Sequence, residues 1–142
     1  MKINSSLDGW LDQLNQRLSC ERSSVMLQIP GDDHLEIVAH RGYIVAPELH
    51  LPIGHGIAGI VAETGEAEIV NDVEFDPRFV TEGHNIKKLL CVPVKNKNQV
   101  VGVVNLSNPE TVDQFQTMHI KWVQDFLMEN PIDRHKHVRP EV

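Results

Sequence analysis

Apolar residues recur at helical spacing at the start of the chain. Leu7, Leu11, Leu14 and Leu18 form one stripe within residues 5–18, and this spacing predicts an amphipathic helix. The apolar face of such a helix must be buried. Two hypotheses are open for its cover: the sheet of the same chain, or a helix of a partner molecule.

From residue 23 the pattern changes to that of strands. Residues 24–29 and 35–40 predict a hairpin around a turn at residues 30–33. A weaker extended piece over 49–53 leads into a glycine turn. Residues 56–65 then predict a short helix. We expect Gly65 to end this helix by adopting the left-handed conformation.

The stretch that follows is short and irregular. Residues 67–70 predict a brief strand, and residues 75–79 (FDPRF) predict a compact aromatic turn. Pro77 is free to begin a helix there, because the first helical position needs no N–H. Residues 80–88 have no clear period and are predicted as a loop beside the sheet.

Residues 89–94 and 100–106 are almost entirely apolar. They predict a hairpin whose strands are covered on both faces, with a connecting loop over 95–99. Pro93 lies inside the first of these strands. Because proline is normally confined to edges, strand starts and bulges, we expect a bulge at this residue.

A last helix is predicted over 112–128, before a polar tail. The apolar residues on one side of it are Phe115, Trp122, Val123, Phe126 and Leu127. Antiparallel hairpins with helices set to one side predict an α+β domain. We expect a single domain, with a helix over 1–19, a core over 20–129 and a frayed tail over 130–142.

The composition is that of one globular domain. The chain has 142 residues, of which 41% are hydrophobic and 23% charged, and its net charge is −7. This acidic balance argues against nucleic acid and against an anionic membrane surface as partners. The sequence contains neither a signal peptide nor an apolar run long enough to cross a bilayer, so a cytoplasmic location is expected.

The order of motifs resembles the signature of GAF domains. Residues 54–79 (GHGIAGIVAETGEAEIVNDVEFDPRF) contain a helix after a glycine turn, a short strand, an aspartate and then DPRF. Residues 89–94 (LLCVPV) and 101–106 (VGVVNL) are similar to the family's LxVPL and GVxNL strands. The resemblance implies a central antiparallel sheet of five to six strands. It further implies terminal helices on one face and a small-molecule pocket under a loop or helix segment on the other.

The expected pocket has an apolar floor and a movable cover. A floor from strands that are apolar on both faces points to Met26, Gln28, Cys91 and Val104. The cover is expected over 75–88. In the cover, Arg78 is expected to contact a ligand as a polar anchor, together with His84, and Phe75 and Phe79 are expected to form the apolar underside. Asp72, just before the cover, is expected to be a second polar anchor.

A structural interpretation of the same polar residues is also open, and we favour it. Asp72 or Asp76 can cap a turn or bind loop N–H groups, with Arg78 paired to one of the acids. His84 lies where some GAF domains hold haem or a linear tetrapyrrole. The residue before it is Gly83, so the thiol that carries such a chromophore is missing and no covalent bilin is expected. The histidines show no zinc-binding spacing, and no metal site is predicted.

Two activities found in GAF domains can be tested against the residues. The free methionine sulfoxide reductases use cysteines in the pocket, but Cys91 lies on an apolar strand, which makes a thiol inert, and nothing places Cys20 near it. The cyclic-nucleotide signature matches at Asn108 and Phe115. It departs at Pro109 and near Met118, where the family has a lysine and an acidic pair. These departures argue against cyclic-nucleotide binding, which stays open because the pocket can vary. The environment of the cysteines leads us to predict no enzyme activity.

The resemblance favours a non-catalytic sensory or regulatory domain that binds a small molecule of unknown identity. The alternative is a protein–protein interaction module whose pocket is filled by side chains, with a redox, haem or metal protein as a remoter one. Because one sheet face is not expected to cover the apolar stripes of both terminal helices, we predict a homodimer through these helices, with a further signalling protein as an additional partner.

Overall fold

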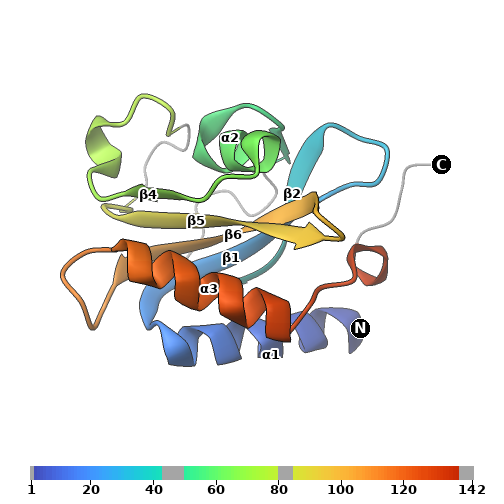
Figure 1. Ribbon diagram of the computed structural model, residues 1–142, viewed down its shortest axis with the longest axis horizontal. Helices are drawn as coiled ribbons and strands as arrows, with labels where there is room; N and C mark the ends of the chain where they lie inside the picture. The colour runs from blue at the N-terminus through green and yellow to red at the C-terminus, as the bar shows by residue number, and fades with distance from the viewer. Residues whose placement is uncertain (1, 43–49, 80–84, 138–142) are drawn as a thin grey trace.

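The computed structural model describes residues 2–42, 50–79 and 85–137, with side chains from Leu7 onward. The elements in these ranges form three layers (Figure 1). A six-stranded sheet lies in the middle, with α1 and α3 on one face and α2 on the other. The predicted α+β architecture, with both terminal helices on the same face, is confirmed.

All neighbouring strands of the sheet are antiparallel, and their order is β3-β2-β1-β6-β5-β4. The elements are α1 (Lys2–Arg17), β1 (Cys20–Gln28), β2 (His34–Arg41), β3 (His50–Pro52), α2 (Gly56–Thr64), β4 (Glu68–Val70), η1 (Val73–Phe75), β5 (Leu89–Asn96), β6 (Gln99–Pro109), α3 (Thr117–Glu129) and η2 (Arg134–Lys136). The long central strands β1, β6 and β5 carry side chains into both cores, which explains why their sequences are apolar on both faces.

The leucine stripe of α1 is buried by its own sheet. Its four leucines are at most 2% exposed and belong to the same core cluster as Val123 and Phe126 of α3. Trp10 joins the two helices, because its ring packs edge-on against Phe126 and its Nε1–H donates to the Asn130 carbonyl oxygen at 2.8 Å. The sheet of the same chain therefore covers the leucine stripe of α1, and the expectation that this stripe needs a partner molecule as cover was wrong. The homodimer itself stays a prediction.

The last helix begins later than predicted. It starts at Thr117, five residues after the predicted start at residue 112. The side chain of His119 determines this start, because its Nδ1 accepts a hydrogen bond from the Gln116 N–H at 2.8 Å and caps the first turn. Phe115 is buried just before the helix, whereas Trp122, predicted on the apolar side, is 44% exposed.

The β5–β6 hairpin has a tighter turn than predicted. Its tip is the pair Lys97–Asn98, both with positive φ angles (54° and 67°), as the favoured two-residue hairpin turn requires. The irregularity in register lies between Val94 and Lys95, one residue beyond the bulge expected at Pro93. Both strands are covered on both faces over most of their length, as expected.

Helix α2 ends as its sequence predicts. Gly65 follows the helix with φ 73°, and its N–H donates to the Val61 carbonyl oxygen at 2.8 Å. The left-handed conformation is available to glycine without steric cost. Helix α2 is short and apolar, and it lies over the face of the sheet opposite α1 and α3 (Figure 1).

Candidate functional site

The candidate pocket floor is the face of the sheet beneath α2. Met26 of β1, Cys91 of β5 and Val103 of β6 lie there and are 4%, 0% and 0% exposed. Helix α2 packs Ile57 and Val61 onto them. Apolar side chains that are only partly buried surround this cluster, namely Ile37, Ile53, Phe79, Ile86 and Val100.

The structure brings together two of the four predicted floor residues. Met26 and Cys91 share the α2-side cluster, but Val104 belongs to the cluster under α1 and α3. Side chains alternate along a strand, so Val103 takes the expected place of Val104. Gln28 is half-buried at the end of β1, where its Nε2 donates to the Asp32 carbonyl oxygen at 2.7 Å.

The segment after β4 covers part of this face. Val73 is 1% exposed, and Phe79 packs against the same cluster. Phe75 is 78% exposed, so its expected place on the underside of the cover is wrong. The reason is the short η1 turn over Val73–Phe75, which precedes Pro77 and directs Val73 inward in place of Phe75. His84 lies outside the described residues.

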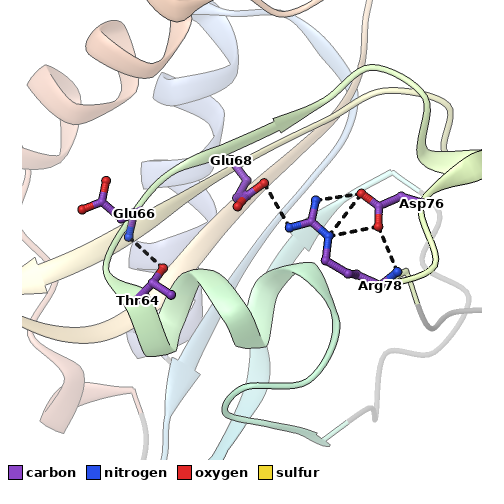
Figure 2. A network of polar contacts seen from close by, with 5 residues as sticks. All are labelled: Thr64, Glu66, Glu68, Asp76 and Arg78. Carbon is purple, nitrogen blue, oxygen red and sulfur yellow. Dashed lines mark hydrogen bonds and ion pairs between the residues drawn. The ribbon is translucent and has the colours of Figure 1, made fainter.

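Arg78 is held by two carboxylates (Figure 2). Its Nε and Nη2 donate to both oxygens of Asp76 at 2.7–3.2 Å, and its Nη1 lies 3.2 Å from Glu68 Oε1. Asp76 Oδ1 also accepts the Arg78 backbone N–H at 2.9 Å. The structural interpretation of Arg78 and Asp76 is thus confirmed. Asp72 is exposed and makes no capping hydrogen bond to η1.

This ion-pair cluster ties the outer arm of the segment to β4. The hydrogen bonds with the Arg78 guanidinium lower the pKa of the Asp76 carboxyl, and the same bonds to Asp76 raise the pKa of Arg78. Both groups are therefore charged at neutral pH. The side chains of Arg78 and Glu68 remain about one-third exposed. Water screens such pairs, and each stabilises the folded state by about 1 kcal/mol or less.

Two asparagines that were not among the predicted ligand contacts fix the base of the segment, although Asn108 is one of the matches to the cyclic-nucleotide signature. Asn71 Oδ1 accepts the Phe115 N–H at 3.1 Å, and Asn71 Nδ2 donates to the Phe115 carbonyl oxygen at 3.2 Å. Asn108 Oδ1 accepts the N–H groups of Lys87 and Lys88 at 2.8 and 3.2 Å. The sequence signal for this structural role is position, since each asparagine lies at or just beyond the end of an apolar strand.

The two cysteines lie on opposite sides of the sheet. Cys20 belongs to the cluster under α1 and α3, and Cys91 to the cluster under α2. Burial raises the pKa of the Cys20 thiol to about 12, with a smaller contribution from the charge of Glu110. Complete burial raises the pKa of Cys91 further. Neither thiol is ionised at neutral pH, so neither is prepared for nucleophilic or redox chemistry.

A model of the GAF domain family matches residues 3–129 of the chain. This chain belongs to the GAF domain family. Its fold is similar to the GAF domain of a phosphoenolpyruvate-protein phosphotransferase (ptsP) from Coxiella burnetii, with a TM-score of 0.77 and 16% identity over 89% of this chain and 79% of that one. It is also similar to free methionine-R-sulfoxide reductase from Neisseria meningitidis, with a TM-score of 0.76 and 17% identity over 89% and 74% of the two chains.

Curated relatives are found among phosphodiesterases. The chain is 35% identical over 89 residues to the dual 3',5'-cyclic-AMP and -GMP phosphodiesterase 11A of Takifugu rubripes, a match covering 55% of this chain and 10% of that protein. It is 35% identical over 86 residues to the dual 3',5'-cyclic-AMP and -GMP phosphodiesterase 11 of Drosophila melanogaster, which covers 56% and 6%. The chain thus spans a tenth or less of these relatives.

Two features are absent from the part of the chain that the structure describes. No three histidine, cysteine or acidic side chains come together there as a metal site would require. None of the helices described has the length and hydropathy that crossing a bilayer demands.

A concave surface lies at the start of α3. It is a shallow groove of about 610 Å³ between residues 111–116 and the first turns of α3. Three of the exposed large apolar side chains of the GAF domain line it, namely Val112, Met118 and Trp122. His119 closes its inner wall, with its ring edge-on to those of Phe115 and Trp122.

His119 predicts a pH dependence of stability. Burial lowers its pKa, and Nδ1 must be unprotonated to accept the Gln116 N–H. As pH falls, the His119 imidazole is therefore protonated first in the unfolded chain. The stability that the neutral His119 adds to the folded state is lost as pH falls from about 6.5 toward the lower pKa of the folded state. We expect the urea midpoint to fall between pH 7.5 and 5.5, and to fall less in His119→Gln, whose amide oxygen can keep the cap. An identical pH profile for both proteins would contradict this assignment.

Proposed function

We propose that this GAF domain is a non-catalytic regulatory domain that binds a small molecule between segment 71–79 and the α2-side face of the sheet. The observation that supports this most is the way the segment is attached. Its inner residues Val73 and Phe79 close an apolar cluster, while Arg78 holds its outer arm through partly exposed ion pairs. Such a cover opens at low free-energy cost.

The absence of catalysis in this proposal rests on the thiols. Cys20 and Cys91 face different cores and are protonated at neutral pH. The reductase from Neisseria meningitidis shares the fold at 17% identity, which does not carry its activity to this chain. GAF domains are generally regulatory, and the match to the phosphodiesterases agrees with that role.

Ligand binding can be tested with a small set of probes. Cyclic AMP and cyclic GMP, named by the relatives' activity, are tested together with methionine sulfoxide, free amino acids and purine nucleosides. A ligand present at 100 times its Kd adds about 2.7 kcal/mol to the free energy of unfolding, which thermal unfolding detects. We expect at least one probe class to bind without being turned over, and to slow hydrogen exchange over residues 73–79 and 85–88.

The two phenylalanines of the segment provide a matched control. Phe79→Ala is expected to weaken binding about tenfold or more, because Phe79 packs on the apolar cluster. Phe75→Ala, at a side chain that is 78% exposed, is expected to leave the Kd unchanged. Protection of α1 instead of the segment, equal effects of the two substitutions, or turnover of methionine sulfoxide that Cys91→Ser abolishes would each overturn the proposal.

The groove at the start of α3 supports a second candidate function, a protein–protein interaction module. Val112, Met118 and Trp122 are exposed side by side there, and exposed apolar patches of this kind mark interaction sites. The homodimer predicted from the sequence would then use this groove in place of the buried leucine stripe. Analytical ultracentrifugation of the purified protein tests dimerisation through the groove. A dimer that Trp122→Glu dissociates supports the interaction module, whereas a monomer at all concentrations excludes the homodimer.

A further inference from the structure

The covering segment includes residues 85–88 as well as residues 71–79, as its two described limbs. These two limbs are joined at their base. The Val73 N–H donates to the Lys87 carbonyl oxygen at 3.1 Å, and Lys88 Nζ donates to the Asn71 carbonyl oxygen at 3.3 Å. Val73 is fully buried beside this junction. The base of the segment is therefore one hydrogen-bonded unit, and both limbs must shift when it shifts.

Asn71 links this base to the entry of α3. Its side-chain amide binds both the N–H and the carbonyl oxygen of Phe115, 44 residues further along the chain. Phe115 is 2% exposed, so these backbone groups have little access to water and depend on Asn71. The asparagine thus fixes the position of the residue from which α3 starts.

From Phe115 the contacts continue to the groove. The Phe115 ring lies edge-on to His119 at 6.1 Å between centroids, and His119 lies edge-on to Trp122 at 5.2 Å. His119 also caps α3 through the Gln116 N–H. Movement of Phe115 therefore alters the packing of Trp122 and the first turn of the helix together.

Asn108 makes a separate attachment of the same base. It leaves β6 with φ 57° and binds Lys87 N–H, Lys88 N–H and the Asn85 carbonyl oxygen, while its amide also donates to Glu21. These bonds hold the second limb to the central strands β6 and β1. Asn108 therefore anchors the base, whereas Asn71 connects it to α3.

We propose that Asn71 is a positioning residue that couples the state of the covering segment to the first turn of α3 and to the groove formed by Val112, Met118 and Trp122. This coupling rests on the proposed function for its physiological trigger, which is the binding of the small molecule. A ligand that displaces the segment changes the position of Phe115 through Asn71, and the groove changes with it. The physical coupling itself needs no ligand and is tested on the free protein.

The test perturbs the segment at Arg78, the far end of its first limb, and observes α3. Arg78→Gln removes the ion pairs with Asp76 and Glu68. We expect it to speed hydrogen exchange of the Met118–Ile120 amides about three- to tenfold and to shift the indole N–H resonance of Trp122. In an Asn71→Asp background, which keeps the acceptor for Phe115 N–H and loses the donor, the same substitution is expected to change these signals less than about twofold.

The other asparagine is the matched control. Asn108→Gly keeps the positive φ angle, removes the anchoring amide, and is expected to leave the effect of Arg78→Gln on α3 intact. Asn71→Ser removes both bonds without adding charge and serves if Asn71→Asp does not fold. A purely structural Asn71 would give additive effects. The coupling is refuted by unchanged α3 signals in Arg78→Gln, by equal changes in both Asn71 backgrounds, or by their loss in Asn108→Gly.

Discussion

Replacing Leu14 with aspartate is expected to unfold the protein rather than to separate two subunits. Leu14 is 1% exposed in the core between α1 and the sheet. A carboxylate there would lose its hydration without gaining a partner, at a cost of several kcal/mol. Small domains are stable by only about 5–15 kcal/mol. Far-UV circular dichroism and urea unfolding should show a chain that is largely unfolded at 25 °C.

The control for this experiment lies one residue earlier on the same helix. Gln13 is exposed, and Gln13→Asp changes the charge identically without entering the core. We expect it to alter the free energy of unfolding by about 0.5 kcal/mol or less. A folded Leu14→Asp protein that sediments as a monomer beside a dimeric wild type would instead show that the α1 stripe faces a partner.

Gly102→Ala is expected to destabilise the domain by about 3 kcal/mol. Gly102 lies in β6, where it pairs with Leu27 of β1. A β-carbon at this position would collide with the Met26 carbonyl oxygen and with the Leu27 side chain. Since the carbonyl belongs to the backbone of a central strand, the two strands would have to separate. Equilibrium urea unfolding measures this loss.

Gly9→Ala is the same chemical change but is expected to raise the free energy of unfolding. Gly9 lies inside α1, and nothing stands within 4 Å of the place its β-carbon would take. Alanine restricts the unfolded chain and favours the helix by about 0.5–1 kcal/mol. The two substitutions should therefore shift the urea midpoint in opposite directions. A stabilising Gly102→Ala would show that β1 and β6 are not packed as closely as described.

Much of the fold was predictable because local signals agree with the tertiary structure. Helix α1 follows its leucine repeat, Gly65 stops α2, and the Asp76–Arg78 pair forms within one turn. Each of these features depends on residues a few positions apart. The motif order also predicted which face of the sheet carries the terminal helices.

The candidate site was harder to predict, because its residues are specified over long distances. A strand that is apolar on both faces shows no alternation of polar and apolar residues, so its sequence does not tell which side chain faces which core. For this reason Val104 was predicted in the pocket floor, whereas Val103 lies there. The backbone just before α3 is held by Asn71, which binds Phe115 across 44 positions. Phe75 and Phe79 look equivalent in sequence, and only the η1 turn distinguishes the exposed ring from the packed one.

The edges of the sheet have a consequence for solubility at high concentration. Within the described residues, the sheet ends on either side in a strand of three residues, β3 and β4. Beyond Cys91, the last residue of β5 that pairs with β4, the rest of this edge of β5 contains Pro93, which has no N–H to offer, and the charged Lys95. Short edges, proline and lysine all discourage strand addition. This GAF domain should therefore resist fibril formation even though its central strands are rich in valine.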